Sequence, residues 1–242
     1  GLNFDYKPDD DTSLYLRTLY SRFEDNETRN STAFEFSDPQ AEDEVGKTKT
    51  KRKLKQREET QEIQSYVFGG ERTMGLWTLS GQAGYSESSE DNPGGIAGAT
   101  FKGSSSIGNG GFYDTEKPRP IIGAGFYDTT NFSLDKVDWQ EQHTKDTEKN
   151  IRLDLARDYD VQGYASQVKF GGKVSRRNKD NDLNAWTYKD FSDLGFSDEQ
   201  LSLNAFNKGN LHYNLGQYGP GISGGAIKDL IGGLNRDDFY NE

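Results

Sequence analysis

Between residues 150 and 177, apolar and polar side chains alternate on both sides of a short polar turn. A period of two predicts β-strands, and two such strands flanking a turn predict an antiparallel hairpin. One face of this hairpin is apolar and carries Ile151, Leu153, Leu155, Val168, Phe170 and Val174. The opposite face is polar and carries Arg152, Asp154, Gln167, Lys169 and Lys173. The apolar face of such a hairpin would face the core in a soluble β-sandwich, or the lipid in a membrane β-barrel.

The same pattern recurs along the chain and predicts three hairpins, at about residues 2–23, 61–86 and 150–176. The predicted strands are Leu2–Lys7 with Ser13–Phe23, Gln61–Gly70 with Leu76–Ser86, and Asn150–Arg157 with Tyr164–Arg176. Within each hairpin the turn is short and rich in residues such as proline, aspartate and glycine. Long segments rich in Asp, Asn, Gly, Ser and charge separate the hairpins, and we expect them to be loops: residues 24–60, 87–149 and 177–242.

Short turns and long loops alternate strictly, so they fall at opposite ends of the predicted sheet. Loops longer than about 15 residues are unusual in a compact soluble domain. Outer-membrane barrels have this asymmetry, with short periplasmic turns and long extracellular loops. A strand of about 10 residues, tilted by about 45°, is also long enough to cross the apolar band of such a barrel.

Composition limits the core that a soluble fold could build. Only 31% of the 242 residues are hydrophobic, and the formal net charge is −11. The acidic balance argues against nucleic acid as a partner. Cysteine is absent, which excludes disulfides and thiolate metal sites.

Three stretches resemble the barrel domain of TonB-dependent outer-membrane receptors. They are FDYKPDDDTSLYLRTLYSRFEDNETRN, QREETQEIQSYVFGGERTMGLWTLSGQAGYSESSEDNP and SQVKFGGKVSRR. The resemblance implies a wide barrel with a plugged lumen, which imports a scarce ligand with energy from the TonB complex. It covers most of residues 1–90 and 150–177 and corresponds to the central part of the barrel domain. The family's plug domain has no counterpart in this chain.

We therefore expect an all-β fold that is a segment of a large antiparallel transmembrane β-barrel, with long extracellular loops and one or two short loop helices. The apolar hairpin face would meet lipid. The polar candidates Arg152, Asp154, Gln167, Lys169 and Lys173 would face the lumen. Aromatic residues near the strand ends would form the girdles at the membrane boundaries: Trp77, Tyr85, Tyr159 and Tyr164.

Residues 47–57 read KTKTKRKLKQR, with a basic residue at every odd position. On a strand, these residues form one positive face: Lys47, Lys49, Lys51, Lys53, Lys55 and Arg57. Three interpretations remain open. The row is a solvated extension of a strand, a contact for lipopolysaccharide phosphates, or part of a lumen that attracts anionic ligands.

The sequence GFYDT occurs twice, at 111–115 and 125–129, and predicts two strands of a loop hairpin that present their tyrosines similarly. A structural hairpin is the simpler interpretation, because Tyr and Phe are ordinary strand residues. The loop aromatics that we single out as ligand-contact candidates are Tyr113, Tyr127 and Trp186. A capping box, SDEQ, predicts a short helix over 198–206, and AIKDLIGGL predicts a second over about 225–234.

We expect no enzyme activity, cofactor or metal site. The histidines, His143 and His212, fall in predicted loops, and no nucleophile-elbow motif is present. The expected location is the outer membrane of a Gram-negative bacterium. The expected partners are outer-membrane lipid and lipopolysaccharide, the TonB complex through parts outside this chain, and a small ligand of the siderophore, cobalamin or saccharide class. The alternative is a soluble or secreted β-sandwich binding module, for carbohydrate or adhesion.

Overall fold

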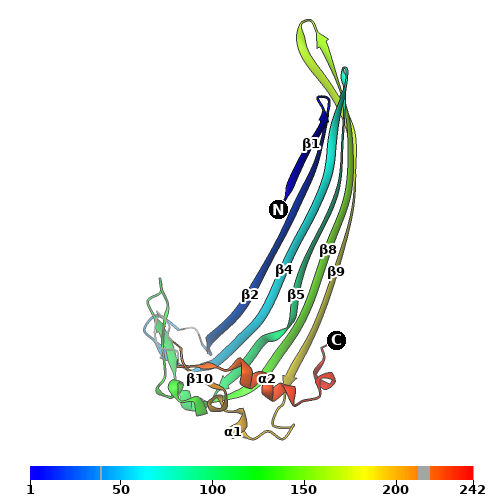
Figure 1. The fold of residues 1–242 in the computed structure, drawn as a ribbon. Helices are drawn as coiled ribbons and strands as arrows, with labels where there is room; N and C mark the ends of the chain where they lie inside the picture. The colour runs from blue at the N-terminus through cyan, green and yellow to red at the C-terminus, as the bar shows by residue number, and fades with distance from the viewer. Residues whose placement is uncertain (39, 212–218, 242) are drawn as a thin grey trace. The chain divides into compact units, whose positions relative to one another are not determined.

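The computed structural model describes residues 1–38, 40–211 and 219–241. Its largest element is a six-stranded sheet with the order β1-β2-β4-β5-β8-β9 (Figure 1). The strands of this sheet are therefore arranged in the order in which they occur along the chain. The strands are β1 (Asn3–Asp9), β2 (Thr12–Phe36), β4 (Thr48–Met74), β5 (Trp77–Gly103), β8 (Phe132–Val161) and β9 (Tyr164–Lys189). The predicted all-β class is confirmed.

Three of the connections in this sheet are two-residue turns, at residues 10–11, 75–76 and 162–163. Gln162 and Gly163 have φ values of 54° and 86°, the left-handed conformation that a type I′ hairpin turn requires. Gly75 at the start of the second turn also has a positive φ, of 64°. These turns join the three predicted pairs of strands, so the sequence identified the hairpins correctly.

The predicted loop boundaries were wrong, because the strands extend far into the segments expected to be loops. Strands β2, β4, β5, β8 and β9 contain 25, 27, 27, 30 and 26 residues. Their extensions carry many charged residues, together with buried apolar side chains that belong to the core of unit 2, such as Leu54, Phe101 and Phe132. Ion pairs between neighbouring strands accompany the pairing there, such as Lys51 with Glu35 at 2.6 Å and Lys145 with Glu87 at 2.9 Å. Cross-strand pairs of opposite charge favour a sheet without an apolar pattern.

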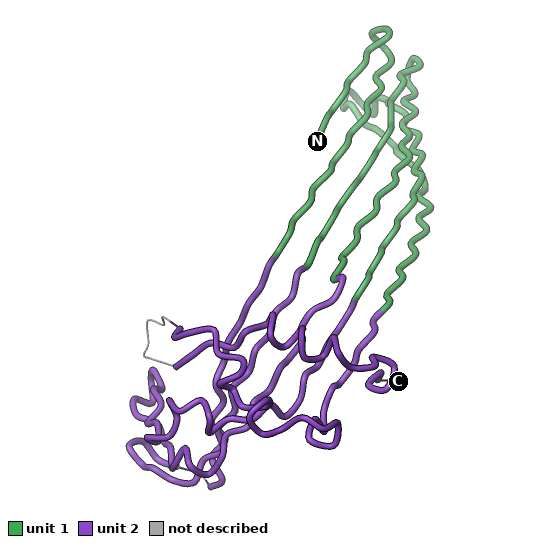
Figure 2. Tube along the Cα trace, turned by 60° about the horizontal axis from the view of Figure 1, so that its bottom comes forward, with its two compact units in different colours: residues 1–25, 59–92, 142–182 green, residues 26–58, 93–141, 183–242 purple. Residues whose placement is uncertain are grey.

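The chain divides into two compact units (Figure 2). Unit 1 contains residues 1–25, 59–92 and 142–182, and unit 2 contains residues 26–58, 93–141 and 183–242. The two-residue turns belong to unit 1. The longer connections, residues 37–47, 104–131 and 190–242, belong to unit 2.

Unit 2 holds the apolar core. It combines parts of the long strands with a three-stranded sheet, β3 (Val45–Gly46), β6 (Gly110–Tyr113) and β7 (Arg119–Ile121), and with the pair β10 (Asn207–Asn210) and β11 (Pro220–Ile222). Helical elements complete it: α1 (Asp198–Leu201), α2 (Gly224–Gly232), η1 (Ser105–Ile107), η2 (Ala124–Tyr127), η3 (Thr129–Asn131), η4 (Leu203–Phe206) and η5 (Arg236–Phe239). The largest fully buried side chains are Phe101, Phe126, Phe132, Leu54, Ile96, Leu203, Ile227 and Val137.

Both predicted helices are present. The Ser197 side chain accepts a hydrogen bond from the Gln200 backbone N–H, and the Gln200 side chain accepts one from the Ser197 backbone N–H, so the capping box is formed. Helix α1 then continues into η4, together covering the predicted range. The helix predicted over 225–234 is α2.

Candidate functional site

An exposed apolar face covers the parts of the six sheet strands that belong to unit 1. In the β1–β2 pair, Phe4 and Tyr6 lie opposite Leu16 and Leu14. A shallow hollow on this surface is lined by residues of β2, β4, β5, β8 and β9, among them Leu16, Tyr66, Phe68, Ala83, Tyr85, Ile151 and Val174. The exposed fraction is 58% for Leu153 and 76% for Val174. A contiguous apolar surface of this kind marks contact with a membrane or another protein.

Two cation–π contacts between β5 and β8 mark the two ends of this apolar face. The Arg157 guanidinium lies 5.1 Å from the centre of the Trp77 ring, and the Lys149 ammonium lies 5.9 Å from the centre of the Tyr85 ring. The two cations are eight residues apart on β8, or about 26 Å along a strand that rises about 3.3 Å per residue. At the tilt of about 35–45° that barrel strands adopt, this length spans about 19–22 Å across the membrane, slightly less than the apolar band of about 25 Å that aromatic girdles flank in outer-membrane barrels.

Past Tyr85, positions of the same parity on β5 and β8 become polar. Lys145 pairs with Glu87 at 2.9 Å, and His143 Nδ1 lies 3.2 Å from an Asp91 carboxylate oxygen. The apolar band therefore has a definite limit on these strands. On the other side, Tyr159 and Tyr164 are exposed beside the 162–163 turn.

The opposite face of the same hairpin carries the five polar residues predicted to face a lumen. Asp154 pairs with Arg152 at 2.7 Å and lies 3.9 Å from Lys169. On either side, Lys173 lies 3.9 Å from Glu148, and Gln167 donates a hydrogen bond of 2.7 Å to Asp158. The structure thus brings Arg152, Asp154 and Lys169 together, and each of the other two predicted residues has a carboxylate partner.

Polar contacts extend across this face to the neighbouring strands. A polar hollow on this face spans β2, β4, β5, β8 and β9, and its lining includes Tyr15, Glu71, Ser80, Gln82, Arg152, Asp154 and Lys169. The Tyr15 hydroxyl donates a hydrogen bond of 3.2 Å to Gln82. Unit 1 therefore has one apolar face and one polar, hydrogen-bonded face.

The basic row belongs to unit 2. Thr50, Arg52 and Leu54 are buried, so the alternate, odd-numbered positions of β4 point away from the core. Lys51 pairs with Glu35 at 2.6 Å, and Glu27 pairs with Arg57 at 3.0 Å and with Lys55 at 3.4 Å. The hydrogen bond from Lys51, with the charges of Lys53 and Lys49, lowers the pKa of the Glu35 carboxyl below its usual value. This pairing is typical of a strand extension, while the lipopolysaccharide and lumen interpretations stay predictions.

The two GFYDT copies differ in structure, so the prediction of two similar strands was wrong. The first lies on β6, which pairs with β7 and β3, whereas the second forms η2. Phe126 explains the difference, because its ring is fully buried against Phe34 and Phe132, with centroid distances of 5.9 and 6.0 Å. Tyr113 and Tyr127 are both exposed and stay candidates for ligand contact.

Two residues expected in loops lie on strands. Trp186 belongs to β9 and is 8% exposed, with the Arg236 guanidinium 3.5 Å from its ring centre and Tyr240 against its edge. It is therefore covered and unavailable as a loop aromatic for a ligand. His143 belongs to β8, and His212 lies outside the described residues.

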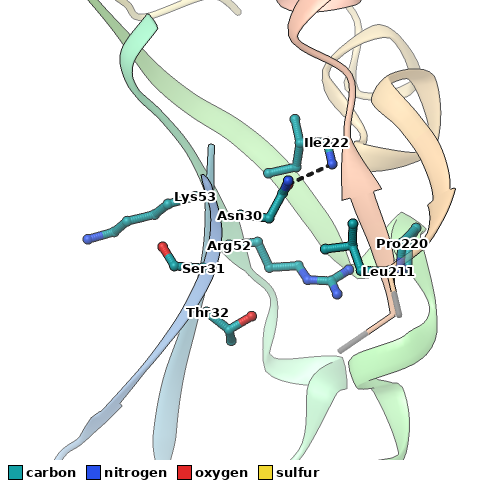
Figure 3. A pocket seen from close by; sticks show the side chains of 8 residues that line it. All are labelled: Asn30, Ser31, Thr32, Arg52, Lys53, Leu211, Pro220 and Ile222. Carbon is teal, nitrogen blue, oxygen red and sulfur yellow. Dashed lines mark hydrogen bonds between the residues drawn. The ribbon is translucent and has the colours of Figure 1, made fainter. Parts of the chain in front are cut away.

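Sequence reasoning missed a pocket around Arg52 in unit 2. Its lining residues are Asn30, Ser31, Thr32, Arg52, Lys53, Leu211, Pro220 and Ile222 (Figure 3). The cavity volume is about 240 Å³. The sequence did contain a signal, because Arg52 is the one basic residue at an even position between 47 and 57. On a strand, that position faces away from the basic row.

No family model matches the chain, and a search of curated proteins finds no match. Among the described residues, no helix is long and apolar enough to cross a membrane. Within the same residues, no group of three or more His, Asp or Glu side chains is placed to hold a metal ion.

Proposed function

We propose that the chain forms part of the wall of an outer-membrane β-barrel receptor of the TonB-dependent kind. The observation that carries the proposal is the exposed apolar face of unit 1, bounded by the Trp77–Arg157 and Tyr85–Lys149 pairs and backed by an ion-paired polar face. Lipid would cover the apolar face. The polar face would line a water-filled or plugged lumen.

The exposed face favours a membrane barrel over a soluble β-sandwich. In a sandwich, the apolar face of each sheet packs against a second sheet at about 10 Å. Here Ile151, Leu153 and Phe170 are each more than half exposed. Leaving such side chains in water would forfeit roughly 1.5–3 kcal/mol apiece, which contact with lipid would recover.

The proposal requires further strands beside the outer strands, β1 and β9. Each of these has a sheet neighbour on one side only among the described residues. Unpaired backbone groups cost several kcal/mol each in hydrocarbon, so a membrane sheet must close on itself. The partner strands would come from the remainder of the barrel.

Ligand capture would belong to unit 2, whose longer connections are residues 37–47, 104–131 and 190–242. They carry the exposed tyrosines Tyr113 and Tyr127. In the resembling receptors, the captured ligand passes through the plugged barrel with energy from the TonB complex. The ligand would be a scarce small molecule of the siderophore, cobalamin or saccharide class.

Fractionation of the native polypeptide tests this proposal. We expect peptides of this chain in the outer-membrane fraction, from a detergent-extracted parent band that migrates faster before boiling than after it. Such heat-dependent migration reflects a folded barrel that resists detergent. Recovery from the soluble fraction, with migration unchanged by boiling, would contradict the proposal and favour the soluble binding module.

A further inference from the structure

Arg52 is a buried cation without a carboxylate partner among the described residues. Its side chain is 3% exposed, and its Nη1 atom is buried without a hydrogen-bond acceptor. Residues 212–218, which lie outside the description, contain no Asp or Glu in the sequence. Burial lowers the pKa of the Arg52 guanidinium to about 10, so the group keeps its charge at neutral pH.

Two aromatic rings and a glycine hold the guanidinium in place. Its central carbon lies 4.9 Å from the centre of the Phe126 ring and 5.3 Å from that of Phe132. A Cβ on Gly219 would come within 2.8 Å of Nη2, so a larger residue there would push against the guanidinium. Gly219 also has a φ of 70°, which favours glycine.

The guanidinium lines the cavity and reaches toward Leu211 and Pro220, whereas Lys53 points away from it (Figure 3). Asn30 Oδ1 accepts a hydrogen bond of 3.0 Å from the Ile222 backbone, which ties β11 to β2 and keeps this wall in place. The pocket therefore has an unpaired buried donor on one side and apolar walls from Leu211, Pro220 and Ile222 on the other.

An unpaired buried charge is costly, and replacing buried charges with apolar residues often stabilises a protein. The rings under Arg52 offset part of this cost, since the face of an aromatic ring attracts a desolvated cation. They cannot accept the in-plane hydrogen bonds that a guanidinium donates at its edge. An anion in the cavity would accept them.

We propose that the Arg52 pocket binds the carboxylate of a small organic acid with an apolar body. A carboxylate matches the planar edge of a guanidinium and takes two parallel hydrogen bonds. The walls formed by Leu211, Pro220 and Ile222 suit the apolar body. A phosphate dianion fits less well, because a single buried cation would leave part of its charge uncompensated.

This inference does not depend on the proposed membrane function. Every lining residue belongs to unit 2, and the apolar band lies in unit 1. Failure of one proposal would therefore leave the other standing.

The test is calorimetric titration of the full chain in non-ionic detergent with benzoate, with neutral benzamide as the matched probe. We expect benzoate to bind and benzamide to bind at least tenfold more weakly. Arg52→Met should weaken benzoate binding at least tenfold. Lys49→Met removes the same charge from the opposite face of β4 and should leave the affinity unchanged. Inorganic phosphate should bind more weakly than benzoate.

Thermal unfolding without ligand separates binding from a structural role. We expect Arg52→Met to unfold at the wild-type temperature or above it, because it removes an unpaired buried charge. A large drop in the unfolding temperature would overturn the proposal and make Arg52 a structural anchor for Phe126 and Phe132.

A second variant tests the cavity itself and leaves Arg52 in place. Leu211→Trp fills the cavity from its rim and should block benzoate binding while the guanidinium is retained. Equal benzoate affinity in this variant, or equal affinity for benzoate and benzamide in the wild type, would overturn the proposal.

Discussion

Leu153 and Asp154 are neighbours in the sequence and lie in opposite environments. Leu153 is exposed on the apolar face, midway along β8 between Lys149 and Arg157. Asp154 lies on the polar face, where it forms an ion pair with Arg152. Strand geometry alone explains this, because successive side chains point to opposite faces. If the apolar face meets lipid, Leu153 lies near the middle of the bilayer.

The central position of Leu153 makes it the most sensitive place for a charge. Leu153→Arg should destabilise the membrane-inserted protein by about 2–4 kcal/mol, the cost of an arginine at the midplane of a barrel. Denaturant unfolding from lipid vesicles measures this change. The control is Gln167→Arg, which adds the same charge on the polar face beside Asp158 and should be near neutral. Equal effects at the two positions would refute the assignment of the faces.

For single residues, the sequence predicted which face of a strand each side chain occupies, but it did not predict that Arg52 is buried. The face of a strand on which a side chain lies depends only on whether its position is odd or even, so Ile151, Leu153 and Leu155 could be assigned to one face from the sequence. The burial of Arg52 depends on Phe126, Phe132 and Gly219, which are distant in sequence. No local pattern specifies that encounter.

The hairpins show what local sequence determines about an element. Pairing and turns followed from alternation and from residues such as Gly75 and Gly163, which supply positive φ at the turns. Strand length did not follow from the alternation, because ion pairs between strands, such as Lys51–Glu35, accompany the extensions. Which charges meet depends on register, and register cannot be read from one strand alone.

The close packing of β9 against β8 leads to a prediction for two neighbouring glycines of β9. A Cβ on Gly171 would come 2.2 Å from Asp154 Oδ1 and 2.5 Å from the Leu153 carbonyl oxygen, whereas a Cβ on Gly172 would meet nothing within 4 Å. Gly171→Ala should therefore lower the free energy of unfolding by roughly 1–3 kcal/mol, as overpacking does. Gly172→Ala should be neutral or slightly stabilising. Denaturant titration of both variants checks this, and equal stability would contradict the described β8–β9 packing.

The helices and the two GFYDT copies also separate what local sequence determines from what tertiary packing determines. The Ser197 capping box is local and was predicted, as was α2. The second GFYDT copy became η2 because Phe126 packs against Phe34 and Phe132. Identical five-residue sequences therefore took two structures, and tertiary packing decided between them.

For the whole molecule, the sequence predicted that short turns and long connections alternate. It did not predict that the long connections help to build a core of their own in unit 2. That core depends on contacts between distant segments, such as Phe101 with Phe206 at 5.3 Å. The apolar residues of the chain are thus divided between a buried core in unit 2 and an exposed face in unit 1.

The measurement that tests the membrane-wall account most directly is a single-cysteine scan along β8. The chain has no cysteine, so one spin label can be placed at each position from 150 to 156 without background. In the native outer membrane, we predict high oxygen accessibility at 151, 153 and 155, and access of a water-soluble relaxation reagent at 152 and 154. Equal access of the water-soluble reagent at both sets of positions would contradict the account.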